Sequence, residues 1–89
     1  MKNLIERNYQ SIVDRGLITP TTSIREFWMK LEEEVQEFIE AESVKNRNEE
    51  LADIILVCFN IAKHYNIDIE KELVNKIIKN ELRAKNKLT

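Results

Sequence analysis

Apolar residues recur at spacings of three and four along most of the chain, which is the period of an amphipathic α-helix. The period predicts a first helix over about 3–15, a second over about 24–43, a third that ends near Tyr65 and a fourth over about 69–86. A short turn, SVKNRN at 43–48, would separate the second helix from the third. No segment alternates as a strand does, and no internal repeat is found. The chain is therefore predicted to be all-α, with four helices joined by short connections into a bundle.

The ends of these helices carry recognisable stop and start signals. The segment GLITPTT opens with a glycine that is expected to stop the first helix, and its proline makes the segment a loop and a candidate lid. Ser23 and Glu26 form the S-x-x-E pattern of a capping box at the start of the second helix. Asn46 and Glu49 are expected to cap the third helix, and Asp68 the fourth.

The third predicted helix carries apolar residues around most of its circumference, because Leu56 and Phe59 point to a different side from Ile54 and Ile61. An 89-residue monomer has too few helices to cover all of these sides. Chains of this length are also marginally stable alone, and association is a common remedy. The pattern therefore predicts a subunit interface on this helix, and with it at least a homodimer.

The composition narrows the classes of function. The chain has 14 basic and 16 acidic residues and a net charge of −2, which argues against a general nucleic-acid binder. No apolar run is long enough to span a bilayer, and the N-terminal stretch lacks the apolar core of a signal peptide. Cys58 is the only cysteine, and it is expected to be a small buried residue in a reducing cytoplasm. These features predict a single cytoplasmic domain over 1–89, without a membrane or nucleic-acid partner.

Two pairs of acidic residues flank the apolar stripes of the second and third helices. Glu34 and Glu37 are three residues apart and share a helix face, as do Glu50 and Asp53. The short turn makes these helices antiparallel neighbours, in which the position numbers of facing residues have a constant sum. Glu37 with Glu50, and Glu34 with Asp53, both have the sum 87, so their common midpoint falls just before Val44. Four carboxylates are therefore predicted to meet at one level beside the core.

Four carboxylates at one place repel one another, and partial burial raises their pKa values as a group. A divalent cation removes this conflict, and Mg²⁺ is commonly bound by carboxylates together with substrate phosphates. Acidic pairs at this spacing also arise by chance on solvated helices, so one pair alone would indicate only a charged surface. Two pairs in facing register leave a metal site and a charged surface about equally open.

The acidic motifs L-x-E-E-x-x-E and E-x-x-D resemble the signature of the MazG-like, all-α nucleoside triphosphate pyrophosphohydrolases. They stand here at 31–37 and 50–53. Lys30 matches the frequent K-L-x-E-E form of the first motif. A K-x-x-x-N-x-x-R pattern on the following helix also matches, and its residues here are Lys76, Asn80 and Arg83. The resemblance covers roughly 24–85.

This resemblance implies a four-helix, bundle-like domain of the all-α pyrophosphatase type that is completed by oligomerisation, as a homodimer or a dimer-of-dimers tetramer. It implies hydrolysis of a (deoxy)nucleoside triphosphate between its α- and β-phosphates, which yields a monophosphate and pyrophosphate. It also implies Mg²⁺, for which Mn²⁺ can substitute, held by four carboxylates: Glu34, Glu37, Glu50 and Asp53.

The resemblance also implies roles for other residues. Glu33 is the spare carboxylate of the motif and could orient or deprotonate the attacking water, a role that Glu34 could also fill. The substrate would be bound by Lys30, Trp28, Lys76, Asn80 and Arg83, the last three contacting phosphates. Without the acidic motif, those three would indicate only a solvated basic face near a helix end.

Less can be said of the nucleobase. Trp28 and Phe27 could stack on a base, but residues of an apolar stripe more often belong to a core. A chain of this length offers little room for a dedicated base pocket. Asn60 and His64 fall on the same side of the third helix as Asp53, and His64 is expected to lie at the surface of the helix end.

Two rival functions remain. A phosphoribosyl-ATP pyrophosphatase resembles the same family, but the glycine-rich and additional basic features expected for a ribosyl-phosphate site are missing here. A non-enzymatic, obligate helical dimer that acts as an interaction module would explain the apolar third helix. It would not explain carboxylates in register beside the core.

Overall fold

The computed structural model describes residues 1–88, and this part of the chain forms four helices and no strand. The helices are α1 (Lys2–Asp14), α2 (Ile24–Glu40), α3 (Val44–His64) and α4 (Ile69–Leu88). The predicted all-α class is therefore confirmed. None of the described helices combines the length and the hydrophobicity needed to cross a membrane.

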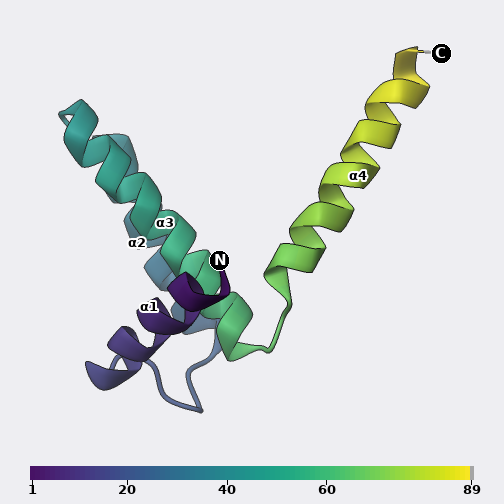
Figure 1. Cartoon of the computed structure of the whole chain (residues 1–89). Coiled ribbons are helices and arrows are strands. Elements are labelled where there is room, and N and C mark those ends of the chain that lie inside the picture. Colours follow the sequence, from purple (N-terminus) through teal and green to yellow (C-terminus); the bar gives the residue numbers. More distant parts are fainter. Residues whose placement is uncertain (89) are drawn as a thin grey trace.

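Helices α1, α2 and α3 pack together, whereas α4 extends away from them as the second arm of a V (Figure 1). The antiparallel pair of α2 and α3 forms the first arm, and α1 packs against α3 near its base. A small core lies where these elements meet, and its buried apolar residues are Ile18, Phe27, Val57 and Ala62. This core holds α2 and α3 in the antiparallel register that the acidic pairs require.

Helix α2 begins with the predicted capping box. The backbone N–H of Glu26 donates to Ser23 Oγ at 3.2 Å, and the Ser23 N–H donates to Glu26 Oε2 at 2.6 Å. The predicted turn at 43–48 is wrong, because only Ala41–Ser43 separate α2 from α3. Ser43 caps α3 instead of Asn46 or Glu49, since its Oγ accepts the N–H of Asn46 at 3.1 Å.

Two helix ends use the left-handed backbone conformation. Gly16 has φ = 74° and ends α1 as predicted, with the N–H of Leu17 donating to the carbonyl of Ile12. Asn66 has φ = 55° and ends α3 with the equivalent bond from Ile67 to Ala62. Asparagine tolerates this conformation better than most residues other than glycine. Asp68 then caps α4 as predicted, because its Oδ1 accepts the N–H of Lys71 at 3.2 Å.

The loop between α1 and α2 is held against the helices by His64. His64 Nε2 lies 2.9 Å from the carbonyl oxygen of Thr22, and its Nδ1 lies 3.0 Å from the hydroxyl of Tyr9. The expectation of a surface histidine is therefore wrong, since the ring is half-buried and makes an edge contact with Phe27. Both ring nitrogens are satisfied when Nε2 donates and Nδ1 accepts, so His64 joins α1, the loop and α3.

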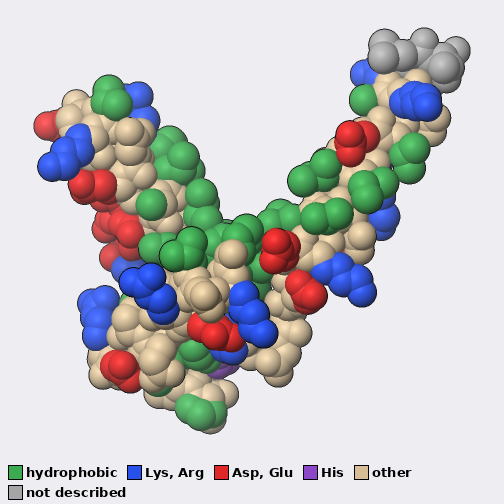
Figure 2. All heavy atoms as spheres, in the orientation of Figure 1, with side chains coloured by type: hydrophobic (Ala, Val, Ile, Leu, Met, Phe, Trp, Pro, Cys, Tyr) green, Lys and Arg blue, Asp and Glu red, His purple; other side chains and the backbone are tan. Residues whose placement is uncertain are grey.

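The single chain does not close into a four-helix bundle. All residues from 70 to 87 are exposed, and the radius of gyration is 15.7 Å, against about 12 Å for a compact chain of this length. Hydrophobic side chains line the inner faces of both arms of the V (Figure 2). Cys58 is exposed in this arrangement and not buried as predicted. On α3 the exposed large apolar residues include Leu51 and Ile55, whereas Leu56 and Phe59, which were expected to need a partner, are half-buried within the single chain.

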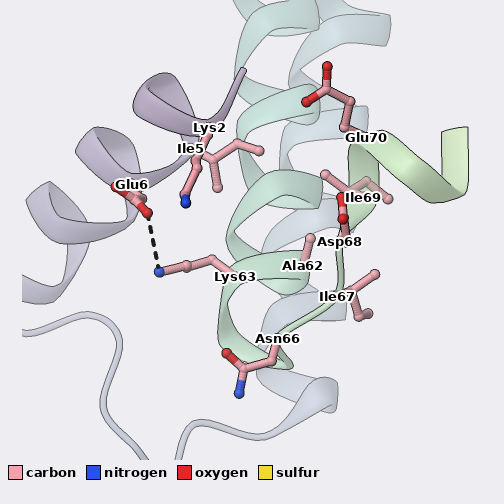
Figure 3. Close-up of a pocket in the computed structure, with 10 residues that line it drawn as sticks. All are labelled: Lys2, Ile5, Glu6, Ala62, Lys63, Asn66, Ile67, Asp68, Ile69 and Glu70. Carbon is pink, nitrogen blue, oxygen red and sulfur yellow. Dashed lines mark ion pairs between the residues drawn. The ribbon is translucent and has the colours of Figure 1, made fainter. Parts of the chain in front are cut away.

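A shallow hollow of about 430 Å³ lies where the α3–α4 connection meets α1 (Figure 3). Lys63 of α3 and Glu6 of α1 form an ion pair across its edge, with 3.8 Å between Nζ and Oε1. The acidic pairs of α2 and α3 do not line this hollow. It lies at the base from which α4 projects.

Candidate functional site

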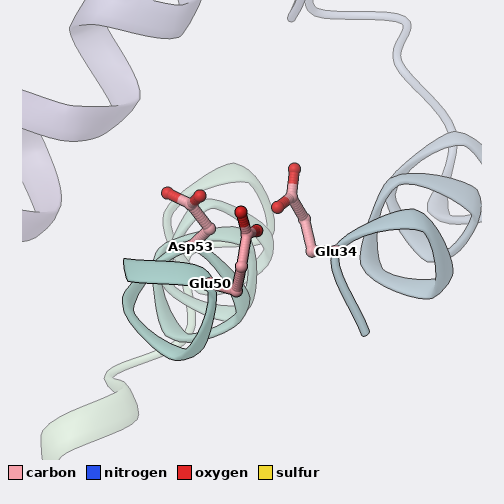
Figure 4. A group of neighbouring side chains, drawn as sticks. All are labelled: Glu34, Glu50 and Asp53. Carbon is pink, nitrogen blue, oxygen red and sulfur yellow. The ribbon is translucent and has the colours of Figure 1, made fainter. Parts of the chain in front are cut away.

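Glu34 of α2 and Glu50 and Asp53 of α3 point toward one another (Figure 4). Each contributes one carboxylate oxygen to a group whose atoms all lie within 4.8 Å of one another. The structure therefore brings together three of the four acids that the register placed at one level. We call Glu34, Glu50 and Asp53 the acidic cluster.

Glu37, the fourth predicted acid, is exposed and lies at the edge of the acidic cluster. A hydrogen bond with Glu50, followed by repulsion from Glu34, raises the pKa of Glu37 from its ordinary 4.5 to about 7.

The acidic cluster contains buried oxygen atoms that lack partners. Glu34 is only 6% exposed, and the Oε2 atoms of both Glu34 and Glu50 are buried without a hydrogen-bond partner among the described residues. A buried carboxylate oxygen without a partner costs free energy. Three carboxylates with two unsatisfied oxygens form the all-oxygen donor set that suits Mg²⁺, so the residues present fit this ion.

Lys30 supplies the positive charge nearest to the acidic cluster. Its Nζ lies 2.9 Å from Glu34 Oε1 and 3.6 Å from Glu33 Oε1, and the hydrogen bond to Glu34 raises the pKa of Lys30. Burial and then repulsion from Glu34 raise the pKa of Asp53, against the lowering effect of Lys30. One lysine therefore compensates the acids only in part.

A cavity of about 460 Å³ adjoins the acidic cluster. Lys30, Glu34 and Asp53 form one part of its wall. The other walls come from α1, from the loop after it, and from the apolar faces of α2 and α3. The loop expected to be a lid thus covers the cavity, and His64 fixes it there.

The remaining predicted site residues lie in three places. Trp28 is 57% exposed and belongs neither to the core nor to the cavity wall. Glu33 is exposed beside Lys30. The basic stripe, which comprises Lys76, Asn80 and Arg83, is exposed on α4 and lies on the arm away from the acidic cluster (Figure 1). The single chain therefore does not bring the basic stripe to the acids.

Sequence reasoning assigned no role to one polar pair of the cavity wall. Asn60 of α3 is 6% exposed, and its Oδ1 accepts a hydrogen bond from Asn8 Nδ2 of α1 at 2.8 Å. The signal in the sequence was an asparagine within the most apolar helix, two turns after Asp53 on the same face. Its partner Asn8 could not be found from the sequence, because the pair is separated by 52 positions.

The raised pKa of Glu37 predicts how stability depends on pH in EDTA. A carboxyl group that binds its proton more tightly in the folded state stabilises the fold below pH 4.5 and loses this effect as pH rises through about 7. Glu37→Gln, which stays neutral, should therefore melt close to the parent at pH 4.5 and above it at pH 8. Thermal melts of both proteins across this range measure the difference. A difference that does not change with pH would show that Glu37 is not coupled to the acidic cluster.

The chain matches no protein-family model, no curated protein and no solved structure.

Proposed function

We propose that the protein is a magnesium-dependent nucleoside triphosphate pyrophosphohydrolase that acts in the cytoplasm. The observation that carries this proposal is the acidic cluster with its unpartnered carboxylate oxygens at the wall of a cavity. The resemblance of the motifs at 31–37 and 50–53 to the MazG-like enzymes gives the reaction. The cytoplasmic location is supported by the single unpaired cysteine.

Within this proposal, Glu34, Glu50 and Asp53 hold the metal, and Glu37 joins them once it loses its proton. Bound Mg²⁺ would neutralise phosphate oxygens and lower the pKa of a water molecule. Lys30 at the cavity wall can leave Glu34 to contact a phosphate. Glu33, exposed beside Lys30, would accept a proton from water, a role that Glu34 could also fill.

We also propose that the chain acts as a homodimer or as a dimer of dimers. A compact monomer of 10.6 kDa exposes about 5,500 Å². This chain exposes 7270 Å², an excess of about 1,800 Å². A stable interface removes about 800 Å² from each partner, so the excess is large enough for one or more interfaces. The apolar inner faces of α3 and α4 are the surfaces a second copy would cover (Figure 2).

Assembly would also determine whether the basic stripe lies close to an acidic cluster. Lys76, Asn80 and Arg83 project from the arm away from the acids of their own chain. In the proposed enzyme, these residues contact phosphates only if assembly carries α4 of one copy to the acidic cluster of another. The role of the basic stripe in substrate binding therefore depends on the proposed assembly.

The same observations give less support to the two rival functions than to the proposed enzyme. A non-enzymatic helical dimer explains the exposed apolar faces but gives no reason for buried carboxylate oxygens without partners beside a cavity. A phosphoribosyl-ATP pyrophosphatase would use the same acids, so only the substrate separates it from the proposed enzyme.

A panel of ribo- and deoxyribonucleoside triphosphates, together with phosphoribosyl-ATP, tests the function. With Mg²⁺, we expect equal amounts of monophosphate and pyrophosphate from at least one nucleoside triphosphate, and no turnover in EDTA. Chromatography of nucleotides with an enzymatic pyrophosphate assay measures both products. Turnover of phosphoribosyl-ATP alone would favour the rival enzyme. The absence of pyrophosphate from every substrate would contradict hydrolysis of this kind.

A further inference from the structure

The cavity extends along α3 from the acidic cluster to Asn60. Asp53 and Asn60 are two helical turns apart, which corresponds to about 10 Å along the helix axis. A ribose and its base span a comparable distance from the 5′ oxygen to the far edge of the base. A ligand with phosphates at the acidic cluster would therefore place its base near Asn60.

The walls between these two ends suit a flat, apolar group. Phe27 is buried and contributes an aromatic side chain, and Ile12, Ile18 and Val57 supply aliphatic surface. The volume of about 460 Å³ falls within the range of small-molecule sites, which are mostly apolar with a few placed polar groups.

The polar groups of the wall away from the acidic cluster include Arg15, Thr22 and Glu26 and, at the far end along α3, Asn60 and Asn8. Their mutual hydrogen bond uses the Oδ1 of Asn60 and the Nδ2 of Asn8. This leaves the Nδ2 donor of Asn60 and the Oδ1 acceptor of Asn8 without a partner among the described residues. If both amides were turned over, the pair would still leave one donor and one acceptor. A donor beside an acceptor is complementary to the hydrogen-bonding edge of a nucleobase, which enzymes commonly read in this way.

We propose that this cavity binds the nucleoside part of the substrate, and that Asn60 and Asn8 read the edge of its base. The proposal rests on the proposed function, because it names the group attached to the phosphates at the same site. It makes Asn60 a specificity-determining residue and not a catalytic one, since it lies two turns from the acids.

Nucleoside binding in EDTA tests this inference without any hydrolysis. The probes are the common ribo- and deoxyribonucleosides, which carry no phosphate and need no metal. We expect at least one to bind the parent protein in an NMR chemical-shift titration. Asn60→Leu, which keeps the approximate shape but removes both hydrogen-bonding groups, should raise its Kd about tenfold or more.

Two further variants complete the experiment. Asn75→Leu, on the exposed surface of α4, should bind as the parent does. Asn8→Leu combined with Asn60→Leu removes the buried pair together, so it can stay folded if Asn60→Leu alone does not. It should also lose nucleoside binding.

The result separates the two proposals. Nucleoside binding that needs Asn60, in a protein that hydrolyses no triphosphate, would support the cavity and contradict the enzyme. A parent protein that binds no nucleoside, or a folded variant without Asn60 that binds as tightly as the parent, would overturn the inference.

Discussion

Asp53→Asn should lower kcat/KM for the triphosphate substrate by at least about 100-fold. The substitution keeps the shape of the side chain but removes a charge that the metal needs, and even partners behind metal ligands contribute 10- to 100-fold. In EDTA the variant should melt at or above the temperature of the parent. Burial and repulsion from Glu34 raise the pKa of Asp53, so the charged carboxylate is unfavourable in the metal-free fold.

Mg²⁺ should then stabilise the parent more than Asp53→Asn. A ligand at a hundredfold excess over its Kd stabilises the folded state by about 2.7 kcal/mol, which raises the Tm of a domain of this size by roughly 10 °C or more. Glu32→Gln removes the same charge from an exposed position of α2 outside the acidic cluster, and should leave both activity and the Mg²⁺ shift near those of the parent. If Asp53→Asn melts well below the parent in EDTA while Mg²⁺ shifts both equally, the cluster is structural and not a metal site.

Ile77→Asp should convert the proposed oligomer into a monomer. Ile77 lies in the middle of α4 and is 55% exposed in the single chain, within a stripe that continues through Leu73, Val74, Ile78 and Leu82. A carboxylate at the centre of a covered apolar face must be desolvated, which costs several kcal/mol and exceeds what such an interface can absorb. Sedimentation equilibrium at micromolar concentration should show a mass of 10.6 kDa for the variant and a multiple of it for the parent.

Lys79→Asp provides the matched control for this variant. It introduces the same side chain on the opposite face of α4, since two positions correspond to about 200° of rotation. This variant should keep the mass of the parent. A parent protein that sediments as a monomer at micromolar concentration would contradict the assembly, and a dimeric Ile77→Asp would place the interface elsewhere.

The helices and most of their ends could be predicted because they depend on neighbouring residues. The capping box at Ser23, the glycine stop at Gly16 and the cap at Asp68 each use side chains within a few positions. The start of α3 was misplaced because Ser43 and Asn46 are both acceptable N-caps, and local sequence does not rank them. His64 was misplaced because its partners, Tyr9 and Thr22, are distant in sequence.

The acidic cluster could be anticipated because an antiparallel helix pair with a short connection has a fixed register. The error in the turn did not matter, since the connection at 41–43 still lies within about two positions of the midpoint between Glu34 and Asp53. The cavity and the Asn8–Asn60 bond could not be anticipated, because they depend on how α1 packs against α3. The position of α4 could not be anticipated either, since its apolar stripe predicts burial against another surface but does not say which one.

The ion pair between Lys30 and Glu34 bears on whether the chain needs a metal ion in order to fold. With Lys30 Nζ 2.9 Å from Glu34 Oε1, the most buried acid has a counter-ion from its own helix. A newly made chain can therefore pack α2 against α3 before it meets any ion, unlike small domains whose folding waits for their metal. In the proposed enzyme, a cation at the acidic cluster would compete with Lys30 for Glu34. It would then free a lysine at the cavity wall, where an incoming phosphate would need it.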